Sequence, residues 1–269
     1  MFIIKVSSKN QKNLTLLFFK SYNLIRKKVI FLNYQLEVRR KIEEYPVREL
    51  IVGNKFLKEN LPDIPENNYY KTLGRMVEKG QLEKVAKGVY CRPKITKFGK
   101  ISIGEENILN YYIGKENYTG VVIGYRLYNK YGITTQVSKT VKVYSNILEE
   151  KRKVVKNIEI NKINMTIDLK TKRAIEQLEI LENRDQIEDI DKNNFRQFLK
   201  SVAEEYSDEA FIKVLRNVKY KKRTIAYLEK ILNSRGVENT LSQFLNKTSK
   251  YKIPALEEFY ESAYKQRGI

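Results

Sequence analysis

Five polar side chains lie close together between Pro65 and Arg92, and all of them can hydrogen-bond to nucleobase edges or to phosphates. At about 100° per residue they fall on one arc of a helix expected over Glu66–Lys79. Asparagine suits adenine and arginine suits guanine when a helix lies in the major groove, whereas lysine and threonine also reach phosphates. The five residues are Asn67, Asn68, Lys71, Thr72 and Arg75.

The ends and the apolar side of this segment predict the helix. Pro65 has its φ preset for the first helical position, acidic Glu66 suits the helix dipole, and Gly80 ends the helix. The arc opposite the polar side chains is about 120° wide, which is typical of a stripe that faces a core. Its residues are Tyr69, Tyr70, Leu73, Met76 and Val77.

A β-hairpin is expected directly after this helix. Gln81–Ala86 has strand character, Lys87-Gly88 is a turn dipeptide, and Val89–Arg92 forms the returning strand. Lys84, Lys87 and Arg92 make the hairpin basic. A helix with a polar face followed by a basic hairpin indicates a device for holding a DNA duplex, with Lys84 and Lys87 on the flanking backbone. The same pattern also occurs in proteins whose polar helical face is only solvated.

The charge of the chain favours the nucleic-acid interpretation. The formal net charge is +20, from 52 Lys and Arg against 32 Asp and Glu, and the isoelectric point is near 9.7. Such an excess attracts polyanions, nucleic acid first and an anionic membrane second. An AT-rich genome also enriches lysine, but this bias alone should not leave acids so outnumbered. Residues 1–33 contribute +7, residues 34–98 contribute +5 and residues 99–269 contribute +8.

Several classes of chemistry are excluded by composition. The chain has no histidine and one cysteine, Cys91. It therefore cannot build a disulfide framework, a Ser-His-Asp or Cys-His catalytic group, or a cysteine–histidine zinc site. We expect no enzyme activity, metal or cofactor, and we expect Cys91 to be a packed small hydrophobe. The apolar cluster Leu14–Phe19 is shorter than the roughly 20 residues that span a bilayer, so a cytoplasmic location without export is predicted.

Residues 34–98 are predicted to form a winged helix-turn-helix domain. Residues 1–33 lack acids and clear periodicity, so they are expected to be a basic extension, either an arm on DNA or a passive tail. A helix over Tyr34–Glu44 should end before Pro46. The remaining expected elements are a short strand in Val47–Val52, a short helix through Leu57–Asn60 capped by Asn54, and then the helix and hairpin described above.

Two stretches resemble a known protein family. YYKTLGRMVEKGQLEKVAKGVYCRPKITKFG and GYRLYNKYGITTQV (residues 124–137) are similar to the AbiEi-type antitoxins of bacterial abortive-infection, type IV toxin–antitoxin systems and to their transcriptional-regulator relatives. The resemblance covers residues from about 34 to about 145, and its second half is the more specific. It implies a cytoplasmic, phage-defence antitoxin whose N-terminal domain represses its own operon. It also implies that the C-terminal domain counteracts a nucleotidyltransferase-like toxin without a stable complex. Residues 1–33 lie outside the family pattern, and no motif matches beyond Glu150.

Residues 99–269 are predicted to be an antitoxin-like α+β domain with a small sheet, helical from about residue 169. A strand over Val121–Ile123, a turn at Gly124 and a helix over Tyr125–Tyr131 with Gly132 as its cap are expected. Further strands are expected at Val141–Tyr144, Lys153–Ile160 and Ile163–Ile167, with a turn at Asn161-Lys162. Further helices are expected after Leu169 and at Asn193–Glu204, Ser207–Val218, Thr224–Asn233 and Asn239–Leu245.

Two alternatives to a DNA-binding antitoxin follow from the same residues. The chain could be a regulatory module whose winged domain binds protein, with its charge reflecting genome composition. It could also be a metal-dependent nuclease, for which Glu159, Asp168 and Lys170 are the candidate groups. The basic cluster Lys219–Arg223 could bind phosphates or be a solvated joint between two helices.

Overall fold

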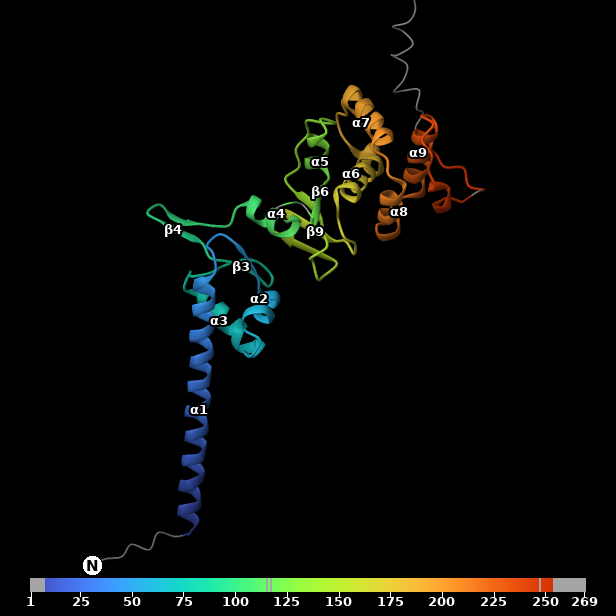
Figure 1. Ribbon diagram of the computed structural model, residues 1–269. Helices are drawn as coiled ribbons and strands as arrows, with labels where there is room; N and C mark the ends of the chain where they lie inside the picture. The colour runs from blue at the N-terminus through green and yellow to red at the C-terminus, as the bar shows by residue number, and fades with distance from the viewer. Residues whose placement is uncertain (1–7, 115, 117, 247, 254–269) are drawn as a thin grey trace, which may run out of the picture. The chain divides into compact units, whose positions relative to one another are not determined.

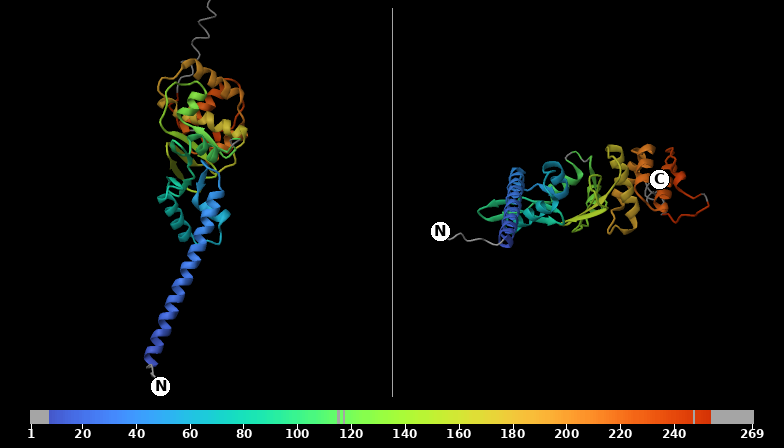
Figure 2. Two further views of the ribbon diagram at one scale, coloured as in Figure 1. Left: turned by 90° about the vertical axis from the view of Figure 1, so that its left-hand side faces the viewer. Right: turned by 90° about the horizontal axis from the view of Figure 1, so that it is seen from below.

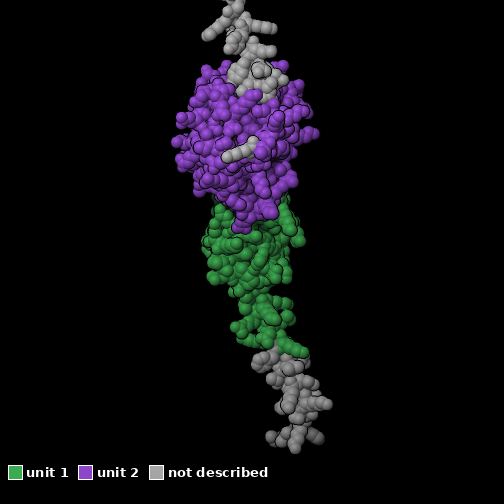
Figure 3. All heavy atoms as spheres, turned by 90° about the vertical axis from the view of Figure 1, so that its right-hand side faces the viewer, with its two compact units in different colours: residues 1–104 green, residues 105–269 purple. Residues whose placement is uncertain are grey.

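The computed structural model describes residues 8–114, 116, 118–246 and 248–253, with side chains from residue 20 onward. The chain divides into two compact units, residues 1–104 and residues 105–269, which Figure 3 colours separately. Both units combine helices with small sheets, so the fold class is α+β, as predicted. Among the described helices, none is long and apolar enough to cross a membrane.

Unit 1 has a long first helix, two shorter helices and two small sheets (Figure 1). A three-stranded antiparallel sheet has the order β1-β3-β2, and β4 pairs with β5 in a separate hairpin. The elements are α1 (Ser8–Glu44), β1 (Leu50–Val52), α2 (Gly53–Asn60), α3 (Glu66–Glu78), β2 (Glu83–Ala86), β3 (Val89–Cys91), β4 (Lys94–Thr96) and β5 (Gly99–Ile101).

The core of unit 1 lies between the C-terminal part of α1 and the apolar side of α3. Val38 and Ile42 of α1 are fully buried in one cluster with Tyr69 and Leu73 of α3. Each of the three aliphatic side chains contributes about 1.5–3 kcal/mol through its burial. The apolar arc predicted for α3 is confirmed: Tyr69, Leu73 and Met76 are buried, and Tyr70 and Val77 are partly buried against the same cluster.

Two local details of unit 1 differ from the sequence prediction. The helix expected from Tyr34 begins at Ser8 instead, because no proline or glycine interrupts the chain before Glu44. Asn54 does not cap the second helix: α2 begins at Gly53, and the side chain of Asn54 accepts a hydrogen bond from the Tyr70 hydroxyl. The position of this side chain inside the first turn, beside a tyrosine distant in sequence, could not be read from local pattern.

Unit 2 has a four-stranded sheet of order β6-β7-β9-β8, in which β7 and β9 are parallel and the other pairs antiparallel. Helix α6 contacts β6 as well as α8 and α9, so it lies between the sheet and the later helices (Figure 2). The elements are α4 (Glu105–Ile113), β6 (Gly120–Ile123), α5 (Tyr125–Lys130), β7 (Val141–Ser145), β8 (Arg152–Val155), β9 (Ile158–Lys162), α6 (Leu169–Asn183), α7 (Lys192–Glu204), α8 (Asp208–Asn217), α9 (Lys222–Asn233), and the 3-10 turns η1 (Arg184–Gln186) and η2 (Leu241–Phe244).

The strand prediction in unit 2 was wrong in two places, at Lys153–Ile160 and at Ile163–Ile167. Lys153–Ile160 is not one strand but parts of β8 and β9. The hairpin turns at Lys156-Asn157, where Lys156 has a φ of 53°, and not at Asn161-Lys162. Ile163–Ile167 is not a strand: its alternate residues Ile163, Met165 and Ile167 are buried, but the segment is irregular. The alternating burial of these residues gives the sequence pattern of a strand, although the segment is not paired as part of the sheet. Helices α6 to α9 are confirmed, whereas Asn239–Leu245 forms only the turn η2.

Candidate nucleic-acid interface

The outward face of α3 is polar and open to solvent. Its exposed residues are Asn67, Lys71, Gly74, Arg75 and Glu78, and they lie opposite the buried Leu73 and Met76. Asn67, Lys71 and Arg75 therefore form one exposed group, as the sequence predicts. Asn68 lies at the border of this face and is half-buried.

Thr72 has to be removed from the predicted contact residues. Its side chain is 0 % exposed, and its hydroxyl donates a hydrogen bond of 2.8 Å to the backbone carbonyl of Asn68. A hydroxyl at this angle on the helix falls between the polar and the apolar faces, and a short side chain there can satisfy itself on the preceding turn. It therefore cannot reach DNA.

Gly74 is a feature of this face that the sequence prediction overlooked. It has an ordinary helical backbone rather than a positive φ, and a Cβ atom added to it would meet nothing within 4 Å. Glycine inside a helix costs roughly 0.5–1 kcal/mol relative to alanine. Neither backbone conformation nor crowding within the fold requires glycine here, and the position is open to solvent.

Arg75 is held in place by the long first helix. Its guanidinium carbon lies 5.1 Å from the centre of the Phe31 ring of α1, which is a cation–π contact. Arg75 itself stays exposed. Phe31 falls in the segment that the sequence predicts to be a basic extension, so this partner of Arg75 was missed.

The predicted hairpin is present as β2 and β3, and two of its three basic residues are free to act at the surface. Lys84 and Lys87 are exposed, and the turn residue Gly88 has a φ of 69°. Arg92 has a different role: its guanidinium donates a 2.6 Å hydrogen bond to the carbonyl of Glu43 and another to that of Tyr45. Arg92 therefore fixes the C-terminal end of α1 rather than adding charge to the hairpin.

A second basic hairpin, β4–β5, was not predicted. Its lysines Lys94, Lys97 and Lys100 are exposed, and Phe98 at its tip is 88 % exposed. The Lys100 ammonium donates a 3.0 Å hydrogen bond to the carbonyl of Gly80, just after α3. This contact links the hairpin to the end of the polar helix. The alternation Lys94-Ile95-Thr96 and Gly99-Lys100-Ile101 around a two-residue turn was the signal for it.

In unit 2, side chains of the GYRLYNKYGITTQV stretch bind other parts of the same unit or the stretch itself. The Tyr131 hydroxyl donates a 2.8 Å hydrogen bond to the buried carboxylate of Glu176, and Lys130 lies 2.8 Å from the same carboxylate. The Asn129 amide donates to the carbonyls of Thr134 and Gln136. The predicted strand, turn and helix are confirmed, with φ values of 70° at Gly124 and 64° at Gly132. These contacts indicate a structural role.

The two carboxylates considered for a nuclease also have structural partners, whereas Lys170 is exposed. Asp168 is the N-cap of α6, where it accepts a 2.8 Å hydrogen bond from the backbone amide of Thr171, and this bond lowers the pKa of Asp168. Glu159 forms a 2.8 Å ion pair with Arg152. Within the described ranges, no group of three or more Cys, Asp or Glu residues is arranged to hold a metal ion.

The basic cluster between α8 and α9 is a joint rather than an open patch. Lys221 is 2.9 Å from Glu182, Arg223 is 3.3 Å from Asp185, and the Lys222 ammonium donates to the carbonyl of Phe244. Three of its cations are thus engaged within unit 2.

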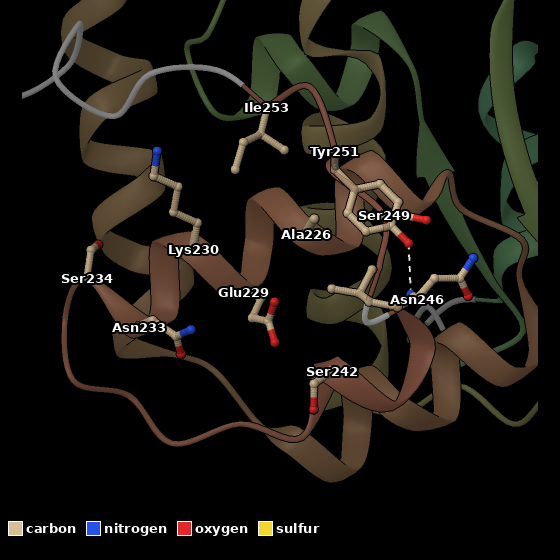
Figure 4. Close-up of a pocket in the computed structure, with 11 residues that line it drawn as sticks. Ala226, Glu229, Lys230, Asn233, Ser234, Ser242, Asn246, Ser249, Tyr251 and Ile253 are labelled. Atoms are coloured by element: carbon tan, nitrogen blue, oxygen red, sulfur yellow. Dashed lines mark hydrogen bonds between the residues drawn. The ribbon is translucent and has the colours of Figure 1, made fainter.

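A cavity of 720 Å³ lies beside α9 (Figure 4). The charged side chains on its wall are Glu229 and Lys230, and the backbone amide of Asn246 donates a 2.9 Å hydrogen bond to the Tyr251 hydroxyl across it. A second cavity, of 790 Å³, is lined by Asn129, Thr134 and Asp191 among others. Amide and hydroxyl side chains contribute to the walls of both.

Residues 38–207 match the family of unknown function DUF6088. The chain belongs to this family. No curated protein matches the chain. Among solved structures, the crystal structure of the RV2827C protein from Mycobacterium tuberculosis is similar, with 11% sequence identity over 76% of this chain and 78% of that chain and a TM-score of 0.39.

Proposed function

We propose that unit 1 is a winged helix-turn-helix that binds duplex DNA, with α3 in the major groove. The observation that carries this proposal is the exposed polar face of α3, where Asn67, Lys71 and Arg75 lie together above a fully packed apolar side. Amide and guanidinium groups on such a face match base edges, and Lys71 also suits phosphate. The order of helix, strand, two helices and hairpin supports the same arrangement.

The two hairpins supply the sequence-independent part of the binding. Lys84 and Lys87 of β2–β3 and the three lysines of β4–β5 are exposed, so they can neutralise phosphates on both sides of the groove. Each phosphate contact releases a counterion, and binding therefore weakens steeply as salt rises. Phe98, exposed beside Lys97, gives the second hairpin an apolar tip of the kind that can enter a minor groove.

A pair of substitutions separates base reading from phosphate binding. Arg75→Ala should cost about 1–3 kcal/mol on the preferred sequence and relax specificity, because arginine reads guanine. Lys87→Ala should weaken all sequences alike and lower the slope of log affinity against log salt by about one. Fluorescence anisotropy with DNA from upstream of the chain's own reading frame, and with scrambled DNA, measures both. Unchanged affinity in both variants would contradict the assignment of this face.

We further propose that the chain acts in the cytoplasm as an antitoxin that represses its own operon and counteracts a nucleotidyltransferase-like toxin. This rests on the resemblance of residues 34–145, and above all of GYRLYNKYGITTQV, to AbiEi-type antitoxins. Co-expression tests it: a nucleotidyltransferase-like protein from the adjacent reading frame should arrest growth, and this chain should relieve the arrest. Relief that persists with Arg75→Ala would assign antagonism to a part of the chain other than the DNA-binding face.

A further inference from the structure

The free part of α1 carries a continuous apolar stripe that no described residue of unit 1 covers. Between residues 20 and 33, Phe31 is partly buried and every other side chain is exposed. Five apolar residues recur on one side of the helix at alternating spacings of three and four residues. They are Tyr22, Ile25, Val29, Leu32 and Leu36, which are 64, 60, 52, 55 and 57 % exposed.

This spacing identifies the kind of surface that fits the stripe. An average repeat of 3.5 residues is the heptad pattern, with Tyr22, Val29 and Leu36 at a positions and Ile25 and Leu32 at d positions. A stripe of this period stays in register only with another helix that supercoils around it. The side of α1 that packs into unit 1, through Val38 and Ile42, is a different one. The sequence alone showed no clear periodicity here because two apolar stripes overlap on one helix.

We propose that α1 pairs in parallel with α1 of a second copy of this chain, forming a short two-stranded coiled coil over Tyr22–Leu36. The central layers, Val29 at an a position and Leu32 at a d position, are of the kind that favours two strands, and sedimentation distinguishes two strands from more. Burial of the five side chains on both helices removes roughly 1,000 Å² from water, which reaches the lower limit of a specific interface. An isolated helix of this length is marginal in water, so pairing also stabilises the part of α1 that projects from the core.

The charges and the layers of the stripe favour a parallel pair. In a parallel pair the flanking positions bring Ser21 near Arg26 of the second copy, Lys28 near Asn33 and Gln35 near Arg40, and none of these is a like-charge pair. The antiparallel register that pairs Tyr22 with Leu32 and Ile25 with Val29 places Arg26 opposite Arg26 and Lys28 opposite Lys28, and like charges there are destabilising. The antiparallel register that pairs Ile25 with Leu36 and Val29 with Leu32 instead leaves Tyr22 opposite Arg39. In the parallel pair each of the five apolar residues meets its own counterpart.

Sedimentation velocity of the full chain across a concentration series, without DNA, tests the pairing. The wild type should show a species of twice 31.8 kDa that dissociates on dilution. Val29→Glu should shift the dissociation constant at least about tenfold, since it places a carboxylate in the seam. Ile30→Glu is the matched control: it makes the same change at the adjacent exposed residue, outside the stripe, and should dimerise like the wild type. Circular dichroism should show the same helix content for both variants at a concentration where the wild type is monomeric.

Disulfide trapping tests the orientation. Leu36→Cys should form a dimer under mild oxidation, because parallel helices place the two residues 36 side by side. In an antiparallel pair they would lie far apart. The wild-type chain, whose Cys91 is buried, is the control and should not cross-link.

Three results would overturn the proposal. These are a wild-type chain of 31.8 kDa at every concentration, equal dimerisation of the Val29→Glu variant and the wild type, or co-sedimentation of a monomeric chain with anionic lipid vesicles that Val29→Glu abolishes. The last would assign the stripe to a membrane surface. None of these readouts depends on DNA binding, so the dimer and the proposed function can fail separately.

Discussion

Replacing Gly74 with alanine should affect stability and DNA binding in opposite directions. Gly74 lies within α3 with helical backbone angles, and the added methyl group would meet no atom within 4 Å. Alanine in place of glycine inside a helix gains about 0.5–1 kcal/mol, because it restricts the unfolded chain without strain in the folded one. We therefore expect the variant to melt about 2–5 °C above the wild type.

DNA binding should weaken in the same variant. The methyl group would stand on the same exposed face as Asn67, Lys71 and Arg75, at its edge, where a glycine backbone leaves room for another molecule to approach. A loss of about tenfold in operator affinity, or 1.4 kcal/mol, is expected if groove atoms pack there. Thermal melts and anisotropy titrations on the same preparation measure the two effects. A variant that melts higher and binds its operator as tightly as the wild type would refute the close approach of this face to DNA.

Glu78→Ala is the control for this experiment. Glu78 is exposed one turn after Gly74 on the same side of α3, so in the proposed complex its carboxylate would lie near the negatively charged DNA. Its removal should leave binding unchanged or strengthen it on every sequence, since a repulsive charge is lost. If Gly74→Ala weakens DNA binding and Glu78→Ala does not, the added methyl group is the cause, and not a general sensitivity of this face to substitution.

Three further changes test other assignments. Thr72→Val should leave DNA affinity unchanged and alter stability only slightly, because the buried hydroxyl bonds to its own helix. A loss of sequence specificity in DNA titrations would show that Thr72 does contact DNA. Asp168→Ala should cost about 0.5–2 kcal/mol, as for other N-caps. Because the folded-state pKa of Asp168 is lowered, this cost should fade in urea melts as pH falls through that pKa. Burial raises the pKa of Glu179, so its unfavourable charging should lower stability as pH rises through that folded-state value. Glu179→Gln should therefore raise the melting temperature at neutral pH and not at acidic pH; a lower value at neutral pH would indicate a favourable charged group.

The fold of α3 and its hairpin was predictable because the signals there are local. Pro65, Gly80 and Gly88 mark ends and turns, and the apolar side of α3 repeats at helical spacing. The length of α1 was not predictable in the same way. Its apolar residues form two stripes on one helix, so no single polar face stands out. The turn at Lys156-Asn157 was also not predicted. Neither residue is a glycine or proline, and the left-handed backbone of Lys156 is set by the pairing of β8 with β9.

The candidate site was predictable as a face but not as a set of contacts. Residue type and spacing found Asn67, Lys71 and Arg75, yet both hydroxyl and guanidinium groups can be satisfied within the protein. Thr72 turns to its own helix, and Arg92 reaches the end of α1. Such choices depend on which backbone carbonyls happen to lie nearby in the folded unit, and sequence spacing does not contain that information.

Helix α1 runs without proline or glycine from Ser8 to Glu44, so one rod contains both the exposed stripe and the residues that anchor it beneath α3. Because the helix is continuous, a rotation of its N-terminal part also turns the domain that is packed on its C-terminal part. Each residue inserted between Leu36 and Val38 would turn the anchored domain by about 100° about the axis of the stripe and shift it by about 1.5 Å. In the proposed parallel pair, such an insertion would turn both anchored domains about the coil, so the length of α1 would set the direction in which each α3 faces DNA.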